Sequence, residues 1–430
     1  MVSRSRTFVR IVLRIVLRIV FLILLPTSAL AFEAVDALVY PSRGAFPEAY
    51  APDPLYPTIL WAQAGLMFDN NPFRLNDATD AQAVLGNEHR SDAVTRLGLG
   101  AGHVARIIGR QGVRLLARGE YYDYLRYDTF DHFAYGLRGE WLWALGSDLV
   151  GVAGYVRENG LADPAEVQAP IKDEITTDRL FANGEYALGP YTRLRAGISE
   201  ERSKREGDRR LLVTDASTVF VGAGIVTPLA NSIGVEARRS EGSSPPGPLI
   251  DPTGAFASNR YTEDEVAVLA VYNLGTQLSV TGRLGRTRRE YSEVVVEEFD
   301  DTTGRASISW RPGPKVAFTF DAYREPRGVL ESDATHIDVR GMRFGISWAP
   351  TLKLVFSASF VNDDRVSQAS LDPTTPQRDE TVRTWRLAAG WEPRRHITVG
   401  TGLQYSERES NTVGRDFDYV QVMANLRYDW

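Results

Sequence analysis

The stretch from residue 340 to residue 360, RGMRFGISWAPTLKLVFSASF, decides the fold of this chain. Apolar residues alternate with Gly, Ser, Arg and Lys on both sides of Ala349-Pro350-Thr351. Alternation with a period of two puts all apolar side chains of an extended strand on one face, and proline marks a turn. The stretch therefore predicts two antiparallel strands joined by a short turn, each with one apolar face and one small, polar face.

The same alternation recurs in residues 384–391 and 397–405. The chain therefore has many apolar strand faces that must be shielded from water. Hydrophobic residues make up 43% of the chain and charged residues 24%, as in an ordinary soluble protein. No stretch after residue 31 approaches the roughly 20 apolar residues of a membrane helix. Closed barrels are the other structure whose backbone can span lipid. We therefore expect hydrocarbon to cover the apolar faces.

Short turn signals recur along the chain about 37 to 46 residues apart, a regular repeat. They are Gly109-Arg110-Gln111-Gly112, Gly146-Ser147-Asp148, Gly189-Pro190, Thr227-Pro228-Leu229, Asn273-Leu274-Gly275, Pro312-Gly313-Pro314, Ala349-Pro350-Thr351 and Glu392-Pro393-Arg394. Longer polar segments lie between them: 70–90, 159–175, 202–210, 241–260, 362–380 and 408–415, with shorter ones near Asp128 and at 297–303 and 326–333. Alternating short and long connections are typical of outer-membrane barrels, which have tight periplasmic turns and long outer loops.

Eight internal short turns separate nine hairpins. The prediction is an all-β, transmembrane antiparallel β-barrel of 18 strands, with 16 as the alternative, and with both termini on the periplasmic side. A barrel of this size leaves an aqueous channel. A β-propeller has a similar repeat length, but each blade divides that length among four short strands. Here each repeat divides into two strands of about 10 to 14 residues, longer than blade strands, so we reject the propeller.

Residues 1–31 are predicted to be a cleaved signal peptide. Arginines open the segment, an apolar run covers 19–25, and Ala29-Leu30-Ala31 forms a small-x-small cleavage signature. A membrane anchor is the alternative, but this apolar run is too short to span. Residues 32–57 contain five prolines and are predicted to be a periplasmic arm or a plug fragment, and residues 58–430 the barrel. These features predict a bacterial outer-membrane location.

Tryptophan placement predicts an aromatic girdle at the lipid–water boundary. Trp310, Trp348 and Trp391 lie at short turns, Trp143 precedes the turn at residue 146, and Trp61 begins the first strand. Scattered core tryptophans are the alternative.

The last residues alternate strictly, with Val420, Val422, Ala424, Leu426, Tyr428 and Trp430 on one face. A terminal strand that ends on an aromatic residue resembles the β-signal of outer-membrane proteins. The resemblance implies that the barrel assembly machinery recognises Leu426, Tyr428 and Trp430.

The segment 67–75, MFDNNPFRL, is similar to the D-x-N-x-F-R region of β-barrel porins encoded with exopolysaccharide biosynthesis genes, the EpsL type. This resemblance implies export of an extracellular polysaccharide, with periplasmic or inner-membrane export proteins, outer-membrane lipid and lipopolysaccharide as partners. A general anion-preferring diffusion porin and a non-conducting structural barrel of the same machinery remain alternatives.

Strand alternation places many arginines on the inner face, although the chain carries a net charge of −6. Charged rings inside a pore select ions by sign, so these arginines predict a path for an anionic glycan or small anions. Alternatively they pair with wall acids such as Glu120, Glu140 and Glu236 and fill the lumen. The candidates are Arg96, Arg114, Arg118, Arg138, Arg193, Arg195, Arg238, Arg283, Arg305, Arg343 and Arg386.

Tyr122 and Tyr124 are predicted to face inward, where they could stack on sugar rings, and Tyr121 to face outward. An outer aromatic girdle is the alternative for the same tyrosines.

No enzyme chemistry is expected. The five histidines form no HExxH pair and no G-x-S-x-G elbow occurs. The absence of cysteine excludes disulfides, thiolate metal sites and a lipid-modified N-terminal cysteine. We expect no cofactor, no metal site and no nucleic-acid partner.

Overall fold

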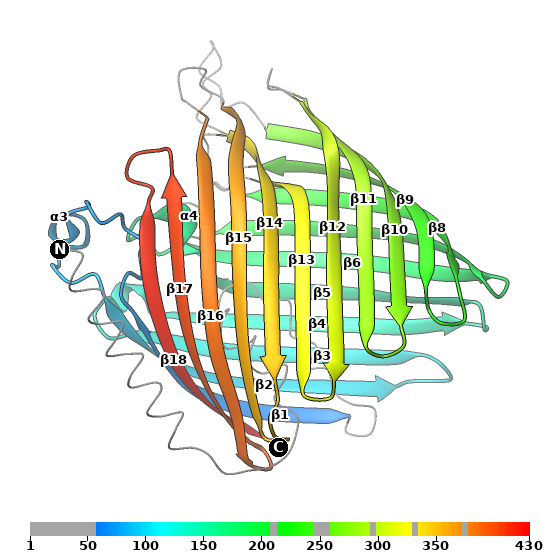
Figure 1. Cartoon of the computed structure of the whole chain (residues 1–430), viewed down its shortest axis with the longest axis horizontal. Coiled ribbons are helices and arrows are strands. Elements are labelled where there is room, and N and C mark those ends of the chain that lie inside the picture. Colours follow the sequence, from blue (N-terminus) through cyan, green and yellow to red (C-terminus); the bar gives the residue numbers. More distant parts are fainter. Residues whose placement is uncertain (1–56, 207–212, 245–258, 293–297, 329–333, 371–376) are drawn as a thin grey trace.

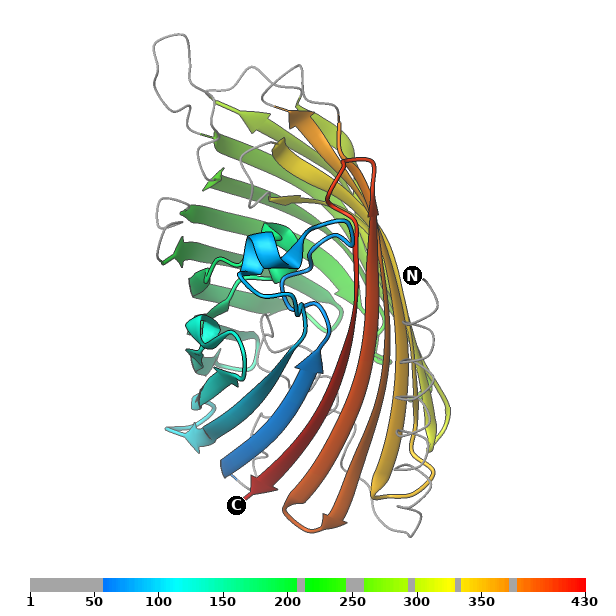
Figure 2. The same cartoon turned by 90° about the vertical axis from the view of Figure 1, so that its left-hand side faces the viewer.

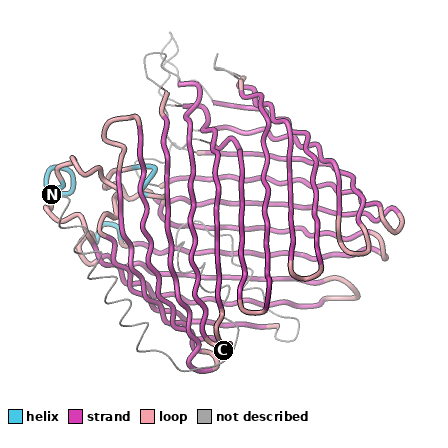
Figure 3. The backbone as a smooth tube through the Cα atoms, in the orientation of Figure 1, coloured by secondary structure: helices cyan, strands magenta, loops and turns pink. Residues whose placement is uncertain are grey.

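The computed structural model describes residues 57–206, 213–244, 259–292, 298–328, 334–370 and 377–430, almost all of them in strands (Figure 3). The predicted signal peptide, and the predicted arm apart from Pro57, lie outside the described residues. The first described strand begins at Thr58. Within the described ranges, no helix is long and apolar enough to cross a membrane.

The strands are β1 (Thr58–Asp69), β2 (Asp92–Arg106), β3 (Gly112–Tyr124), β4 (His132–Leu145), β5 (Leu149–Leu161), β6 (Glu174–Leu188), β7 (Thr192–Arg205), β8 (Thr214–Val226), β9 (Ser232–Ser244), β10 (Asn259–Leu274), β11 (Leu278–Tyr291), β12 (Phe299–Gly313), β13 (Val316–Gly328), β14 (Ala334–Trp348), β15 (Leu354–Ser370), β16 (Asp379–Arg394), β17 (Ile397–Ser410) and β18 (Phe417–Asp429). In the described parts of the connections there are three short helical segments: α3 (Ala81–Leu85), the 3₁₀ turn η2 (Asp128–Phe130) and α4 (Pro164–Val167).

Each strand pairs antiparallel with the next one in sequence, and β1 also pairs with β18 (Figure 1). At this seam the register runs from Trp61 opposite Asp429 to Asp69 opposite Gln421, and the Trp430 amide donates to the Leu60 carbonyl at 2.8 Å. The sheet therefore closes on itself and has no free edge. An 18-stranded antiparallel barrel is confirmed, rather than the 16-stranded alternative.

All eight predicted short turns join successive strands at one end of the barrel, with connections of two to five residues. We call this the short-turn end, and the opposite end the long-loop end. Figure 1 shows α3 at the left edge of the molecule, and Figure 2, viewed from that side, shows it (blue) in front of the strands at the long-loop end.

The strands are longer than predicted, 12 to 17 residues rather than about 10 to 14. The clearest error is residues 362–370, predicted as loop but forming the end of β15, where Asn362 pairs with Met342 and Asp364 with Arg340. Similarly, 326–328 belong to β13. The prediction failed because polar residues occupy both faces there, which hides the alternation while the backbone ladder continues.

The outer and inner faces have opposite chemistry. Large apolar side chains such as Leu66, Leu99, Val266 and Leu284 lie on the outer face and are more than 60% exposed. Buried positions on the inner face include the carboxylates of Glu140, Glu236 and Glu265 and many other polar groups. A soluble protein has the reverse arrangement, with its large apolar groups inside.

Four of the five tryptophans predicted to form a girdle lie on the outer face near the short-turn end, and Trp310 and Trp348 are about half exposed. Trp61 is an error, because its indole points inward and is 2% exposed. It packs on Leu116 and lies beneath the Arg427 guanidinium, 5.1 Å from the ring centroid. The physical reason is Gly100, opposite Trp61 on β2, whose missing side chain leaves room for the ring.

Candidate functional site

Two buried glutamates organise one wall of the interior. Glu236 on β9 and Glu265 on β10 face inward because strand register puts them opposite other inner-face residues. Arg283 on β11 bonds both, with Nη1 2.9 Å from Glu236 and Nη2 2.6 Å from Glu265. Arg238 lies 3.3 Å from Glu236 and 3.6 Å from Glu265. Shared charge-assisted hydrogen bonds of this kind fix both acids and arginines in place.

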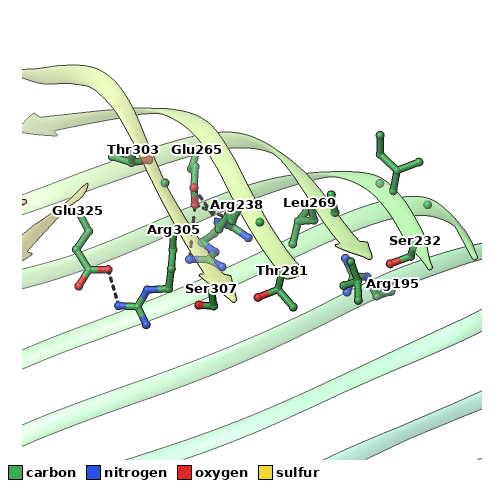
Figure 4. A pocket seen from close by; sticks show the side chains of 18 of the residues that line it. Arg195, Ser232, Arg238, Glu265, Leu269, Thr281, Thr303, Arg305, Ser307 and Glu325 are labelled. Atoms are coloured by element: carbon green, nitrogen blue, oxygen red, sulfur yellow. Dashed lines mark hydrogen bonds and ion pairs between the residues drawn. The ribbon is translucent and has the colours of Figure 1, made fainter. Parts of the chain in front are cut away.

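A cavity of about 550 Å³ adjoins these residues (Figure 4). Cationic groups outnumber anionic groups around it: its lining includes the arginines Arg193, Arg195, Arg238, Arg283, Arg305, Arg324 and Arg327 and the glutamates Glu185, Glu263, Glu265 and Glu325. Several are paired, as Arg305 is with Glu325 at 3.3 Å and Arg193 with Glu185 at 3.5 Å. The Arg195 guanidinium lies 3.9 Å from Glu236, beyond hydrogen-bond distance. This wall is therefore basic despite its ion pairs.

The remaining predicted arginines of the first strands also meet acids. Arg114 and Arg138 both bind Glu140, which is almost fully buried, and the Arg138 Nε lies 2.8 Å from it. Arg118 lies 3.6 Å from Glu158, and Arg96 lies 3.8 Å from Glu120. These pairings match the alternative in which arginines and wall acids balance one another.

A second cavity, of about 330 Å³, lies between loop residues and the opposite wall. On one side are Asp69, Pro72, Arg74 and residues 161–165, and on the other are inner-face residues of β13 to β18. Arg343 of β14 lines it and is exposed to the interior, and within the described residues it has no ion pair or hydrogen bond. Arg386 of β16 also lines it, and its Nε donates to Gln404 at 2.8 Å.

The two tyrosines predicted to contact sugar line this second cavity. Tyr122 is 4% exposed, its ring stacks on His132 at 4.6 Å, and its hydroxyl donates to Glu120 at 2.6 Å. The Tyr124 ring lies near Phe130 and His132. Tyr121 points to the outer face. Most of the Tyr122 ring is covered by protein, and sugar contact by these tyrosines stays a prediction.

Several lining residues were missed from the sequence. Tyr323, Arg327 and Arg365 lie on the inner face of β13 and β15 and contribute to the second cavity. Arg327 and Arg365 fall in segments predicted to be loops. The alternation of Tyr323, Glu325 and Arg327, and of Asp363 with Arg365, was the signal that these strands continue.

Leu426 and Tyr428 lie on the outer face of β18, Trp430 follows directly after the strand, and all three are about half exposed. Their strand pairs with β17 and β1, and therefore completes the barrel. Over the described ranges, no group of three or more His, Cys, Asp or Glu side chains could hold a metal ion.

The fold and interior define a class, the large closed antiparallel β-barrels with a charged lumen. Among solved structures, the chain is similar in general shape to Pseudomonas aeruginosa OpdK with vanillate, at 11% identity and a TM-score of 0.46. That match covers 87% of this chain and 99% of OpdK. A second similar structure is P. aeruginosa OccK2 (OpdF) in complex with glucuronate, at 12% identity and a TM-score of 0.48, covering 87% of this chain and 98% of that one. No protein-family model and no curated protein matches the chain. Likeness at this level describes shape alone.

Proposed function

We propose that this protein is an outer-membrane channel for small organic anions. The membrane location is supported by the two faces of the barrel. A closed barrel leaves no backbone group unpaired at an edge, and its apolar outer face suits hydrocarbon. On β14 the outer face is apolar from Met342 to Trp348, with Arg340 just beyond. At about 3.3 Å per residue, the six residue steps from Met342 to Trp348 cover about 20 Å along the tilted strand.

The preference for anions is supported chiefly by Arg343. Most inner arginines are paired with acids, but Arg343 is exposed to the interior without a partner among the described residues. An unpaired unit charge attracts a counter-ion at 4 Å by about 4 kcal/mol at an effective dielectric constant of 20. A permeating anion would therefore be stabilised here, whereas a cation would be repelled.

The volumes of the two cavities support a small solute. Their volumes, about 550 and 330 Å³, are those of small-molecule sites. Export of an extracellular polysaccharide is a second hypothesis, which rests on the resemblance of residues 67–75 to EpsL-type porins. Comparing secreted with cell-retained polymer after deletion of the gene separates the two, since unchanged secretion leaves only the small-anion channel.

The test replaces Arg343 in the purified protein in planar bilayers. Arg343→Glu should lower the anion-to-cation permeability ratio roughly tenfold, if charge reversal changes the barrier by about 1.4 kcal/mol. Reversal potentials in a salt gradient measure this ratio. Because the chain has no cysteine, Arg343→Cys can also be modified with cationic or anionic thiol reagents, and the cationic reagent should restore anion preference.

The matched control is Arg340→Glu, on the same strand but on the outer face, where the native side chain is 63% exposed. It should leave selectivity unchanged. An open channel whose selectivity ignores the charge at residue 343 would contradict the proposal, and a barrel that never conducts would favour the structural alternative.

A further inference from the structure

Residues 67–75, which resemble a region of EpsL-type porins, also have a structural role in this barrel. Asp69, Asn71, Phe73 and Arg74 are each at most 5% exposed. The Asp69 carboxylate accepts hydrogen bonds from the Asn71 amide at 2.8 Å, the Arg74 guanidinium at 2.8 Å and the Gln421 side chain at 2.7 Å. A buried carboxylate with several donors, one of them charged, is a fixed point in a structure.

The same segment extends the seam between the first and last strands. The Asn70 amide donates to the Val420 carbonyl at 3.2 Å, and the Val420 amide donates to Asn70 Oδ1 at 2.6 Å. Asn71 Nδ2 donates to the Asp418 carbonyl at 3.1 Å. The chain is thus held against β18 at the point where it leaves the wall.

Arg74 turns the chain at this point. Its φ of 55° lies in the left-handed region, which costs a non-glycine residue about 1 kcal/mol or more and persists only when surrounding contacts enforce it. Its guanidinium lies 3.4 Å from the centroid of the Tyr419 ring. Burial lowers the pKa of Arg74, but the charge and hydrogen bond of Asp69, together with Tyr419 and Asp163, raise the pKa above its ordinary value, so Arg74 stays charged.

Two other loops are fastened to this turn. Gln168 Nε2 donates to the Arg74 carbonyl at 3.0 Å and to the Arg415 carbonyl at 3.1 Å. Arg408 Nη1 donates to the Ala165 carbonyl at 2.8 Å. The Phe73 ring packs on Tyr127 and Phe130, with centroids 4.9 and 4.8 Å away. We call the joined residues 70–75, 125–131 and 162–168 the loop partition.

Pro72, Arg74 and residues 162–165 of the loop partition line the second cavity, which is also lined by Tyr323, Arg327 and Arg343. We propose that Asp69 and Arg74 anchor this partition as a fixed obstruction that confines passage to the side lined by β13 to β16. Arg74 is a positioning residue, which sets the size limit of the channel without contacting the solute's charge. This inference rests on the proposed channel function.

The test measures single-channel conductance and exclusion of neutral polyethylene glycols for the full-length protein. Gln168→Ala removes the two side-chain hydrogen bonds to the Arg74 and Arg415 carbonyls and leaves the wall intact. Asp69→Asn with Arg74→Gln neutralises the buried pair without leaving one charge alone. Both should raise conductance, the double variant by about twofold or more, because ion flux grows with the open cross-section. Larger polymers should also enter.

The matched control is Gln111→Ala, a glutamine at the short-turn end whose Nε2 donates to the Ala144 carbonyl at 2.9 Å. It should change neither readout. Folding of each variant is checked by the shift in gel mobility on heating, and if the double variant does not fold, Gln168→Ala decides. An open, folded Gln168→Ala channel with unchanged conductance and exclusion overturns the partition. A wild-type barrel that never conducts instead overturns the proposed channel.

Discussion

Glycine lets large rings lie flat against the wall of this barrel. A Cβ at Gly100 would collide with the Trp61 indole, and one at Gly341 would collide with the Tyr323 ring. In both pairs the ring and the glycine are on the inner face of neighbouring strands. Mid-strand glycine weakens a strand in isolation, but here it provides space that an aromatic side chain fills.

Gly100→Ala should therefore destabilise the folded barrel by about 1 to 3 kcal/mol, the usual cost of overpacking a filled site. Urea unfolding followed by tryptophan fluorescence in detergent or lipid measures the change. Gly282→Ala is the matched control, because nothing lies within 4 Å of the position its Cβ would take. Equal stability of the two variants would show that the Trp61 ring has room to move.

For single residues, the sequence predicts which face of the barrel a side chain points to better than it predicts which residue that side chain pairs with. Period two identifies Arg283 and Arg343 equally as inner-face arginines. Arg283 meets Glu236, 47 residues earlier, whereas Arg343 meets no acid among the described residues. The difference depends on register between strands and on neighbours far apart in sequence, neither of which alternation encodes. The direction of Trp61 was predicted wrongly because it was inferred from its place at the start of the first strand and not from alternation.

Among the elements, turns were predicted more accurately than strand ends. Gly and Pro mark the eight short turns, because those turns need particular backbone angles. Strand ends near the long-loop end carry polar residues on both faces, as in 362–370, so the pattern disappears before the hydrogen-bonded ladder does. The loop partition was beyond prediction, since it depends on contacts such as Gln168 with Arg74, 94 residues apart.

The last strand is the element whose loss should matter most for assembly. Trp430→Ala should reduce the fraction of folded barrel in the outer membrane severalfold, if the terminal aromatic residue is the assembly signal that its resemblance implies. Heat-modifiable protein in membrane fractions measures that fraction. Trp310→Ala is the control, a comparably exposed outer-face tryptophan within an internal hairpin. Equal losses from both variants would assign Trp430 to the girdle alone.

For the whole molecule, the central question is what covers the outer face. Leu99 lies in the middle of β2 on that face and is 65% exposed. In a bilayer, Leu99→Arg should cost about 2 to 4 kcal/mol, whereas Thr95→Arg, nearer the long-loop end of the same face, should cost about 0 to 1 kcal/mol. Unfolding titrations in lipid vesicles measure both.

Lipid makes the cost of a buried arginine depend on its depth in the bilayer, whereas contact with a protein partner gives no such dependence along the strand. Equal costs at residues 95 and 99 would contradict hydrocarbon cover.

The pairing of β1 with β18 has a consequence for biosynthesis. Nine residue pairs join β1 to β18, so the ring cannot close until β18 has been made. Until then both terminal strands present unpaired amides and carbonyls, which are templates for aggregation. A prematurely terminated copy can never hide them. Unpaired edges at β1 and β18 therefore distinguish an unfinished copy from a finished one.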